Sequence, residues 1–187
     1  MTATGNPVLL KAVARPHSIT GKYCIAPNMP VFVEKTNALD NAEGCAYAFT
    51  AHDPAFDGSD DVICIGVAVT RVAECTKEEA RANKGRIMFT YAAMGSVIVA
   101  FPKLRNVKHF IGCKYAVQYG KPAQAEEWQA DGMHSNHARA STFVQAPSAQ
   151  LSTCACFMLM DVSDIETYGN DGGLFYFYGA GSVVPPP

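Results

Sequence analysis

Residues 86–101 read RIMFTYAAMGSVIVAF and give the clearest sign of β structure in this chain. Arg86 to Ala92 and Ser96 to Phe101 are two runs rich in β-branched and aromatic residues, which favour strands. Ala93-Met94-Gly95 separates the two runs, and glycine permits a tight turn there. The stretch therefore predicts two strands joined by a short, hairpin-like loop.

Similar runs recur on both sides of this stretch, with turn-forming residues between them. The further strands we expect are Pro7–Val13, Tyr23–Ile25, Val31–Glu34, Ala46–Ala51, Val62–Val72, His109–Tyr119, Thr153–Val162 and Leu174–Tyr178. In the run 62–72, Gly66 permits a bulge or close packing. Many short strands at roughly even spacing favour a barrel or sandwich over a βαβ fold.

Two short segments have helix signals. Thr76 and Glu79 match a capping box, in which each side chain bonds the other's backbone amide, so a helix is expected over residues 77–83. A second short helix is expected over 123–130, after Pro122. The expected fold is mainly β, a small barrel or sandwich of short antiparallel strands with one or two short helices and a polar insertion.

A chain of 187 residues fits one domain, and such a chain buries roughly 70% of the surface that its unfolded form exposes. Within it we expect a β domain over 1–120 with a flexible N-terminal arm, a polar insertion over 121–150, and returning strands with a proline tail over 151–187. Three successive prolines cannot join the interior of a sheet, because they donate no backbone hydrogen bond.

Charged residues make up only 17% of the chain and apolar residues 49%. This low charge has two explanations: a large core, or surfaces hidden in an oligomer. The net charge is −2 and no Lys/Arg run is long, so no nucleic-acid partner is expected. No apolar stretch is long enough to span a bilayer, and the N-terminus lacks the pattern of a signal peptide. We therefore expect synthesis in the cytosol and no membrane partner.

The chain has seven cysteines, an odd number with no C-x-x-C spacing. They are Cys24, Cys45, Cys64, Cys75, Cys113, Cys154 and Cys156. One interpretation is that most are small buried hydrophobic residues. The other is that some cross-link subunits after release into an oxidising medium.

The sequence lacks the common catalytic and nucleotide-binding motifs. It contains no G-x-S-x-G, P-loop, G-x-G-x-x-G or H-E-x-x-H motif. His109 and Cys113 share a face of an expected strand but would lie about 13 Å apart along it, too far for a thiol–imidazole pair. The chain is therefore expected not to be an enzyme and to need no cofactor.

His134 and His137 are the best candidate metal ligands. On a helix their three-residue spacing would put both imidazoles on one face, with Asp131 nearby. Gly132 and the polar surroundings favour instead a solvent-exposed loop. No metal is assigned, and the two histidines stay weak candidates.

Phe175 to Tyr178 form an aromatic run with no alternation of polarity. One interpretation is a strand buried on both faces. The other is a strand with one face in the domain core and the other against a neighbouring subunit, since an exposed apolar strand favours self-association.

The order of strands and loops between residues 22 and 101 resembles that of the head decoration, or cement, proteins of tailed bacteriophages, such as the one that caps the lambda shell. The blocks that carry the resemblance are 26–36 (APNMPVFVEKT), 63–69 (ICIGVAV), 86–91 (RIMFTY) and 95–100 (GSVIVA). This chain is longer than that pattern, with a helix between the second and third blocks and about 85 further residues after Phe101.

The resemblance implies a structural protein on the capsid surface of the virion, made in the host cytoplasm. It implies a homotrimer seated over junctions between major capsid protein subunits, with the N-terminal segment adding to the capsid's sheets. Pro7, Val8, Leu9 and Leu10 are then the candidate capsid contacts.

Two other functions stay open. One is a small metal- or cysteine-dependent enzyme that uses His134, His137 or a thiol. The other is a carbohydrate- or ligand-binding β module, for which Trp128, Tyr168 and the Asp/Gly-rich loops are the support.

Overall fold

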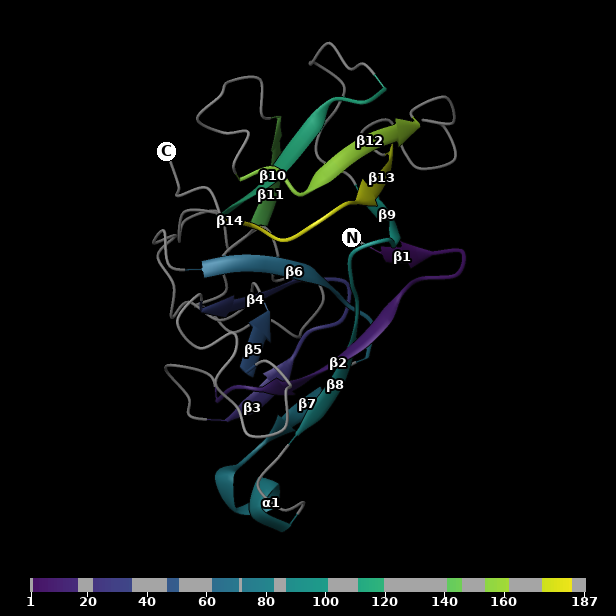
Figure 1. Cartoon of the computed structure of the whole chain (residues 1–187). Helices are drawn as coiled ribbons and strands as arrows, with labels where there is room; N and C mark the ends of the chain where they lie inside the picture. The colour runs from purple at the N-terminus through teal and green to yellow at the C-terminus, as the bar shows by residue number, and fades with distance from the viewer. Residues whose placement is uncertain are drawn as a thin grey trace.

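The structure is a computed structural model, and it describes residues 2–16, 22–34, 47–50, 62–70, 72–82, 87–100, 111–119, 141–145, 154–161 and 173–182. Most of these residues lie in strands, which confirms the expected mainly β fold. The strands form a closed barrel, a second sheet and a two-stranded ribbon (Figure 1).

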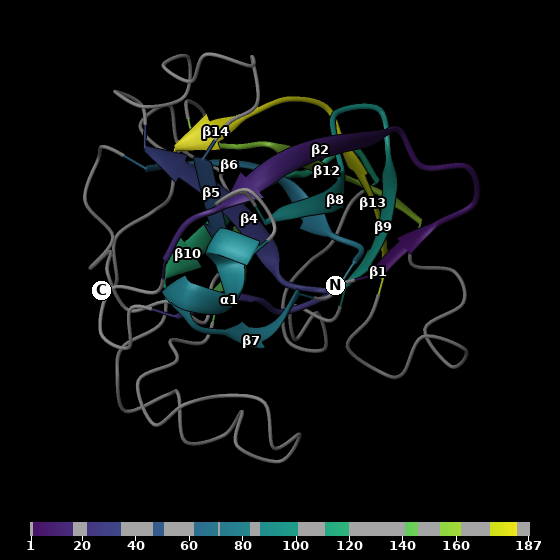
Figure 2. The same cartoon turned by 90° about the horizontal axis from the view of Figure 1, so that it is seen from below.

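Five strands close into the barrel in the order β6-β4-β5-β2-β8, with β8 pairing back onto β6. They are β2 (Leu9–Ala14), β4 (Pro30–Glu34), β5 (Tyr47–Thr50), β6 (Val62–Ala68) and β8 (Met88–Ala92). Figure 2 views these strands from the end at which α1 lies. All neighbours are antiparallel as expected, except β2 and β5, which run parallel.

Gly66 makes closure of the barrel possible. Its φ of 155° is one that residues with a side chain rarely adopt. A Cβ built at this position would lie 2.1 Å from the carbonyl oxygen of Ala92 on β8. The β4–β6 ladder also shifts register here, between Val31 and Phe32. Both the close packing and the bulge expected at Gly66 are confirmed.

The second sheet has six strands in the order β1-β9-β13-β12-β10-β11, and all neighbours are antiparallel. They are β1 (Thr2–Thr4), β9 (Val97–Ala100), β13 (Gly173–Phe177), β12 (Phe157–Asp161), β10 (Lys114–Tyr119) and β11 (Ser141–Gln145). The short β14 (Gly181–Ser182) pairs with β6, while β3 (Tyr23–Ile25) and β7 (Val72–Cys75) form the separate ribbon.

The loop at Ala93-Met94-Gly95 does not form the expected hairpin. β8 belongs to the barrel and β9 to the second sheet, so the two strands do not pair with each other. Gly95 has a φ of 97°, and its amide donates to the carbonyl of Phe177 on β13 (2.8 Å). The carbonyl of Ser96 in turn accepts from the amide of Phe177 (2.9 Å). These bonds to a distant strand turn the chain from one sheet to the other.

Two hydrophobic clusters hold the architecture together. One draws buried side chains from all five barrel strands and fills the barrel. The other lies between the barrel and the second sheet, and its aromatic side chains pack against one another. Phe157 and Phe177 have ring centroids 4.9 Å apart, and Phe32 on β4 lies 5.7 Å from Phe49 on β5. The barrel and the second sheet therefore share one core.

The aromatic run at 175–178 alternates in burial rather than in polarity. Phe175 and Phe177 are fully buried against the barrel, while Leu174, Tyr176 and Tyr178 are half-buried on the other face. The strand is thus not buried on both faces.

The helix expected after Thr76 is present as α1 (Lys77–Ala82). The amide of Thr76 donates to Glu79 Oε2, and the amide of Glu79 donates to Thr76 Oγ1 (3.2 Å), so the capping box is confirmed. The helix expected over 123–130 lies outside the described residues.

Part of the expected polar insertion is a strand. Ser141 to Gln145 form β11, which pairs with β10 along its length, so these residues of the expected insertion belong to the second sheet. Residues 121–140 and the proline tail are not among the described residues.

Candidate functional site

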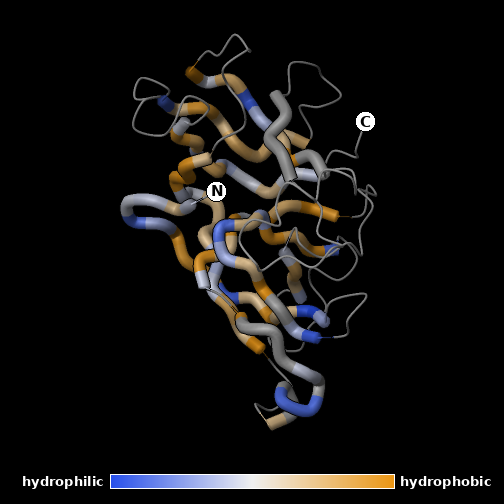
Figure 3. The backbone as a smooth tube through the Cα atoms, turned by 180° about the vertical axis from the view of Figure 1, so that it is seen from behind, coloured by the Kyte–Doolittle hydropathy of each residue, from blue (hydrophilic) through white to orange (hydrophobic). Residues whose placement is uncertain are grey.

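Four large apolar side chains lie exposed around the start of β2 and the corner after β8. They are Val8 (44% exposed), Leu9 (50%), Leu10 (49%) and Met94 (60%), and we call them the apolar ridge. Figure 3 shows the first half of β2 as a strongly hydrophobic part of the backbone. Several large apolar side chains exposed in one part of a fold are typical of an interaction surface.

Backbone hydrogen bonds hold the ridge in place. The amide of Val8 donates to Ser96 Oγ (3.0 Å), and the carbonyl of Val8 accepts from the amide of Ala93 (2.8 Å). Ser96 is fully buried, so its hydroxyl is a fixed anchor. Gly95 leaves room for Val8, whose Cγ2 would be 3.1 Å from a Cβ built on that glycine. The ridge therefore belongs to the folded framework.

The start of β2 is paired on one edge only, within the described part of the chain. Leu9, Leu10 and Lys11 pair with β8, whereas β5 joins β2 only at Val13 and Ala14. Successive strand residues point to opposite faces, so Leu9 and Leu10 project on opposite sides of a two-stranded segment. This explains why both are half exposed, and it leaves apolar groups beside an open strand edge.

A flanking apolar pair extends this surface along β2. Tyr47 and Met88 both lie opposite Val13 in their ladders, and they are 41% and 39% exposed. Lys11, which is exposed, lies between this pair and Leu9 on the same face. The surface is therefore mostly apolar with one cationic side chain in it.

The residues predicted as capsid contacts lie together in the structure. Pro7 is half-buried, and Val8, Leu9 and Leu10 follow it on the ridge. The expected arm is partly described: Thr2 to Thr4 form β1, which pairs with β9 at the edge of the second sheet. Met94 was missed by the sequence analysis, although a large apolar residue in a turn is itself a sign of exposure.

The candidate metal ligands His134 and His137 lie outside the described residues, as do His109, Trp128 and Tyr168. Among the residues that are described, no group of three or more His, Cys, Asp or Glu side chains could hold a metal ion. No helix in that part of the chain is both long and apolar enough to cross a membrane.

The side chains of four cysteines are described, and none of the four forms a disulfide. Cys64 and Cys156 are buried, whereas Cys113 and Cys154 are half-buried. Burial, followed by the hydrogen bond with Cys64, raises the pKa of the Cys156 thiol well above its usual range. A buried thiol that stays protonated is a poor nucleophile.

Arg15 and Glu34 form an ion pair at the other end of β2. Arg15 Nη1 donates to Glu34 Oε1 at 2.7 Å, and the guanidinium lies 4.5 Å from the centre of the Phe49 ring. The pair links three barrel strands or their ends and fits a structural role.

Comparisons with protein-family models, with characterised proteins and with solved structures find no match for this chain.

Proposed function

We propose that this chain is a structural virion protein that binds and stabilises the outer surface of a bacteriophage capsid, as a decoration or cement protein. The observation that carries the proposal is the apolar ridge beside an open strand edge. The proposed partner of this surface is the major capsid protein.

The ridge has the chemistry for docking onto another protein. Covering its exposed side chains would stabilise a complex by about 25 cal/mol for each Å² of apolar surface removed from water. An extended capsid segment lying beside Leu9 to Lys11 would add backbone hydrogen bonds at the open edge. Because Ser96 and β8 hold the ridge in one conformation, little conformational entropy is lost on binding.

Binding at several capsid sites at once would strengthen the attachment made through the apolar ridge. A capsid presents many identical sites, and a homotrimer would engage three of them at once, so modest single contacts sum to firm attachment. The low proportion of charged residues is in keeping with a chain that covers apolar surface by association. The resemblance of residues 22–101 to phage decoration proteins supports the same function.

Binding to capsid shells tests the proposal. Shells assembled from the major capsid protein encoded with this chain would be mixed with the purified chain, sedimented, and imaged by electron microscopy. We expect regular copies on the shell surface. The double variant Leu9→Glu, Leu10→Glu should bind at least about 10-fold more weakly, because two charges would have to be desolvated in the contact.

The matched control is Ile111→Glu, Met160→Glu, which changes two exposed apolar residues away from the ridge (69% and 43% exposed). It should bind shells as the wild type does. Thermal unfolding of both variants verifies that they fold. Equal binding by the ridge variant would exclude the ridge as the contact, and a wild-type chain that ignores the shells would overturn the proposed function.

A further inference from the structure

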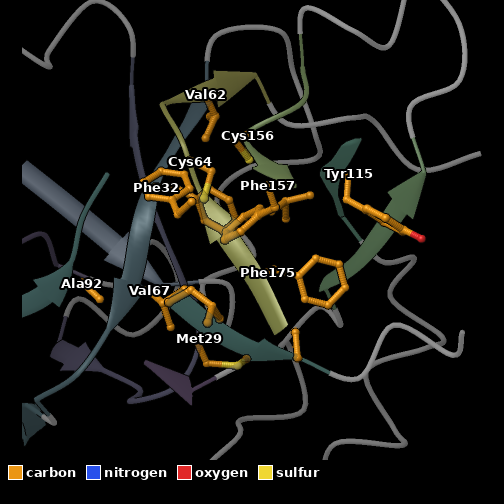
Figure 4. Close-up of a cluster of buried hydrophobic side chains, with 14 of the residues drawn as sticks. Met29, Phe32, Val62, Cys64, Val67, Ala92, Tyr115, Cys156, Phe157 and Phe175 are labelled. Carbon is orange, nitrogen blue, oxygen red and sulfur yellow. The ribbon is translucent and has the colours of Figure 1, made fainter. Parts of the chain in front are cut away.

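Two thiols meet in the core between the barrel and the second sheet. Cys64 lies on β6 of the barrel, and Cys156 directly precedes β12 of the second sheet. They are 1% and 0% exposed and belong to the same buried cluster, and interaction with Cys64 is among the causes that raise the pKa of the Cys156 thiol. The close-up in Figure 4 shows them side by side among the aromatic side chains of this core.

The backbones of both cysteines are fixed by neighbouring strands. The amide of Cys156 donates to the carbonyl of Tyr115, and its own carbonyl accepts from the amide of Tyr178, each at 3.0 Å. Cys64 lies in ladders opposite Phe32 and opposite Gly181. Both cysteines are therefore held on rigid backbone, and Gly181 lies between them, paired with Cys64 and close to Cys156 Cβ.

Gly181 creates the space for this meeting. A Cβ built there would lie 2.3 Å from the carbonyl oxygen of Cys154 and 3.0 Å from Cys156 Cβ. Because glycine has no side chain, the segment from Cys154 to Cys156 can lie against the β14–β6 pair. A larger residue at 181 would push Cys156 away from Cys64.

We propose that Cys64 and Cys156 are an oxidisable dithiol whose disulfide covalently joins the barrel to the second sheet. Hydrogen peroxide is the oxidant class that fits a buried site, because it is small and uncharged. This inference does not depend on the proposed capsid function.

Oxidation of the two thiols by hydrogen peroxide proceeds in two steps. One thiolate attacks a peroxide oxygen, the O–O bond breaks, and a sulfenic acid and, after protonation, water are formed. The second sulfur then attacks the sulfenic sulfur, the S–O bond breaks, and the hydroxyl leaves as a second water once protonated. Two thiols and one peroxide thus give one disulfide and two waters, the sulfurs being oxidised and the peroxide oxygens reduced.

The environment makes the reaction slow but its product durable. Only the thiolate reacts, and burial of Cys156 favours the protonated thiol. Formation of the disulfide requires the two sulfurs to approach to about 2 Å, by movement of the two side chains within the core. Once formed, the disulfide is shielded from reducing thiols by the same core.

The disulfide should raise the melting temperature markedly. It would close a loop of roughly 90 residues, and the chain-entropy model together with typical unfolding entropies gives an increase of about 10 °C. Reduction after unfolding should remove this increase.

The test uses the full-length chain, reduced and then treated with hydrogen peroxide in native buffer. Free thiols are alkylated before digestion, and peptides are mapped by mass spectrometry. We expect a linked pair of peptides that contain Cys64 and Cys156, and a melting temperature about 10 °C above that of the reduced chain.

Two variants separate this pair from other thiols. Cys156→Ala should abolish the gain in melting temperature, whereas Cys113→Ala, which changes a half-buried thiol, should keep it. If Cys156→Ala does not fold, the peptide map of the wild type still decides. A map without the Cys64–Cys156 link, whether other cysteines are oxidised or none is, would overturn the inference.

Discussion

At Gly66 the absence of a side chain lets β6 approach β8 closely enough to close the barrel. We predict that Gly66→Ala lowers the free energy of unfolding by about 3 kcal/mol, because the new Cβ would meet the Ala92 carbonyl and the backbone conformation disfavours a side chain. Denaturant unfolding measures this loss. The loss is large because the Ala92 carbonyl oxygen belongs to the backbone of β8 and cannot move aside as a flexible side chain could.

Gly179→Ala is the control for this substitution. Nothing lies within 4 Å of a Cβ built at Gly179, and its φ is not positive, so the change should stay within about 0.5 kcal/mol. A Gly66→Ala protein as stable as this control would mean that the barrel closes without the close approach described above.

The local sequence indicates the structural role of some single residues but not of others. Gly66 stands out inside a run of β-branched residues, and this context alone predicts a bulge or a close approach. Ser96 and Gly181 have no such signal. Their roles depend on Val8 and Cys156, which lie 88 and 25 positions away in the chain.

Among the elements, α1 is the one whose ends can be read most directly from local sequence. We predict that Thr76→Ala destabilises the helix by about 1 kcal/mol, because the amide of Glu79 loses its acceptor. Amide hydrogen exchange should accelerate about 5-fold in the first turn of α1 and stay unchanged in β8. Unchanged exchange in α1 would mean that the cap contributes nothing.

The pH dependence of α1 offers a second measurement. The hydrogen bonds from Thr76 lower the pKa of Glu79 below its ordinary 4.5. A carboxyl with a lowered pKa in the folded state stabilises it above the unfolded pKa, and this contribution is lost as the pH falls. Exchange in α1 should therefore accelerate below about pH 4.5, and Glu79→Gln should remove this dependence.

Local sequence predicts less about the strands than about α1. Their positions were predictable, because β-branched and aromatic runs separated by turn residues are visible in the sequence. Their partners were not: β8 and β9 are adjacent in the chain, yet they belong to different sheets. The missed strands β1, β7, β11 and β14 are short or polar, and pairing with neighbours gives them their conformation.

For the whole molecule, the buried ionisable groups predict a loss of stability at alkaline pH. Burial raises the pKa of Cys156 from its ordinary 9.0, and that of Tyr115 from 10.0, with a further contribution from Cys113. The unfolded chain therefore loses these protons at lower pH than the folded chain. The contribution of these groups to the free energy of unfolding should be fully present below pH 9.0. Above pH 9.0 the free energy of unfolding should fall, by at most about 1.4 kcal/mol per pH unit for each buried group.

Urea midpoints measured between about pH 8 and 11 under reducing conditions test this prediction. Cys156→Ala should flatten the decline between pH 9.0 and 10.0, whereas Cys113→Ala should leave most of it. A wild-type midpoint that stays constant across this range would show that the thiol is not held protonated by the fold.

The local pattern of this sequence was enough to establish a mainly β fold, most strand positions, the capped helix and the apolar start of β2. These properties depend on residues within a few positions of one another, where side-chain shape and periodicity act directly. The tertiary structure alone decided that the strands form a barrel beside a second sheet, that the start of β2 pairs on one edge only among the described strands, and that Cys64 and Cys156 share one buried cluster. Those outcomes depend on contacts between distant segments, and the energy of such contacts cannot be read from either segment by itself.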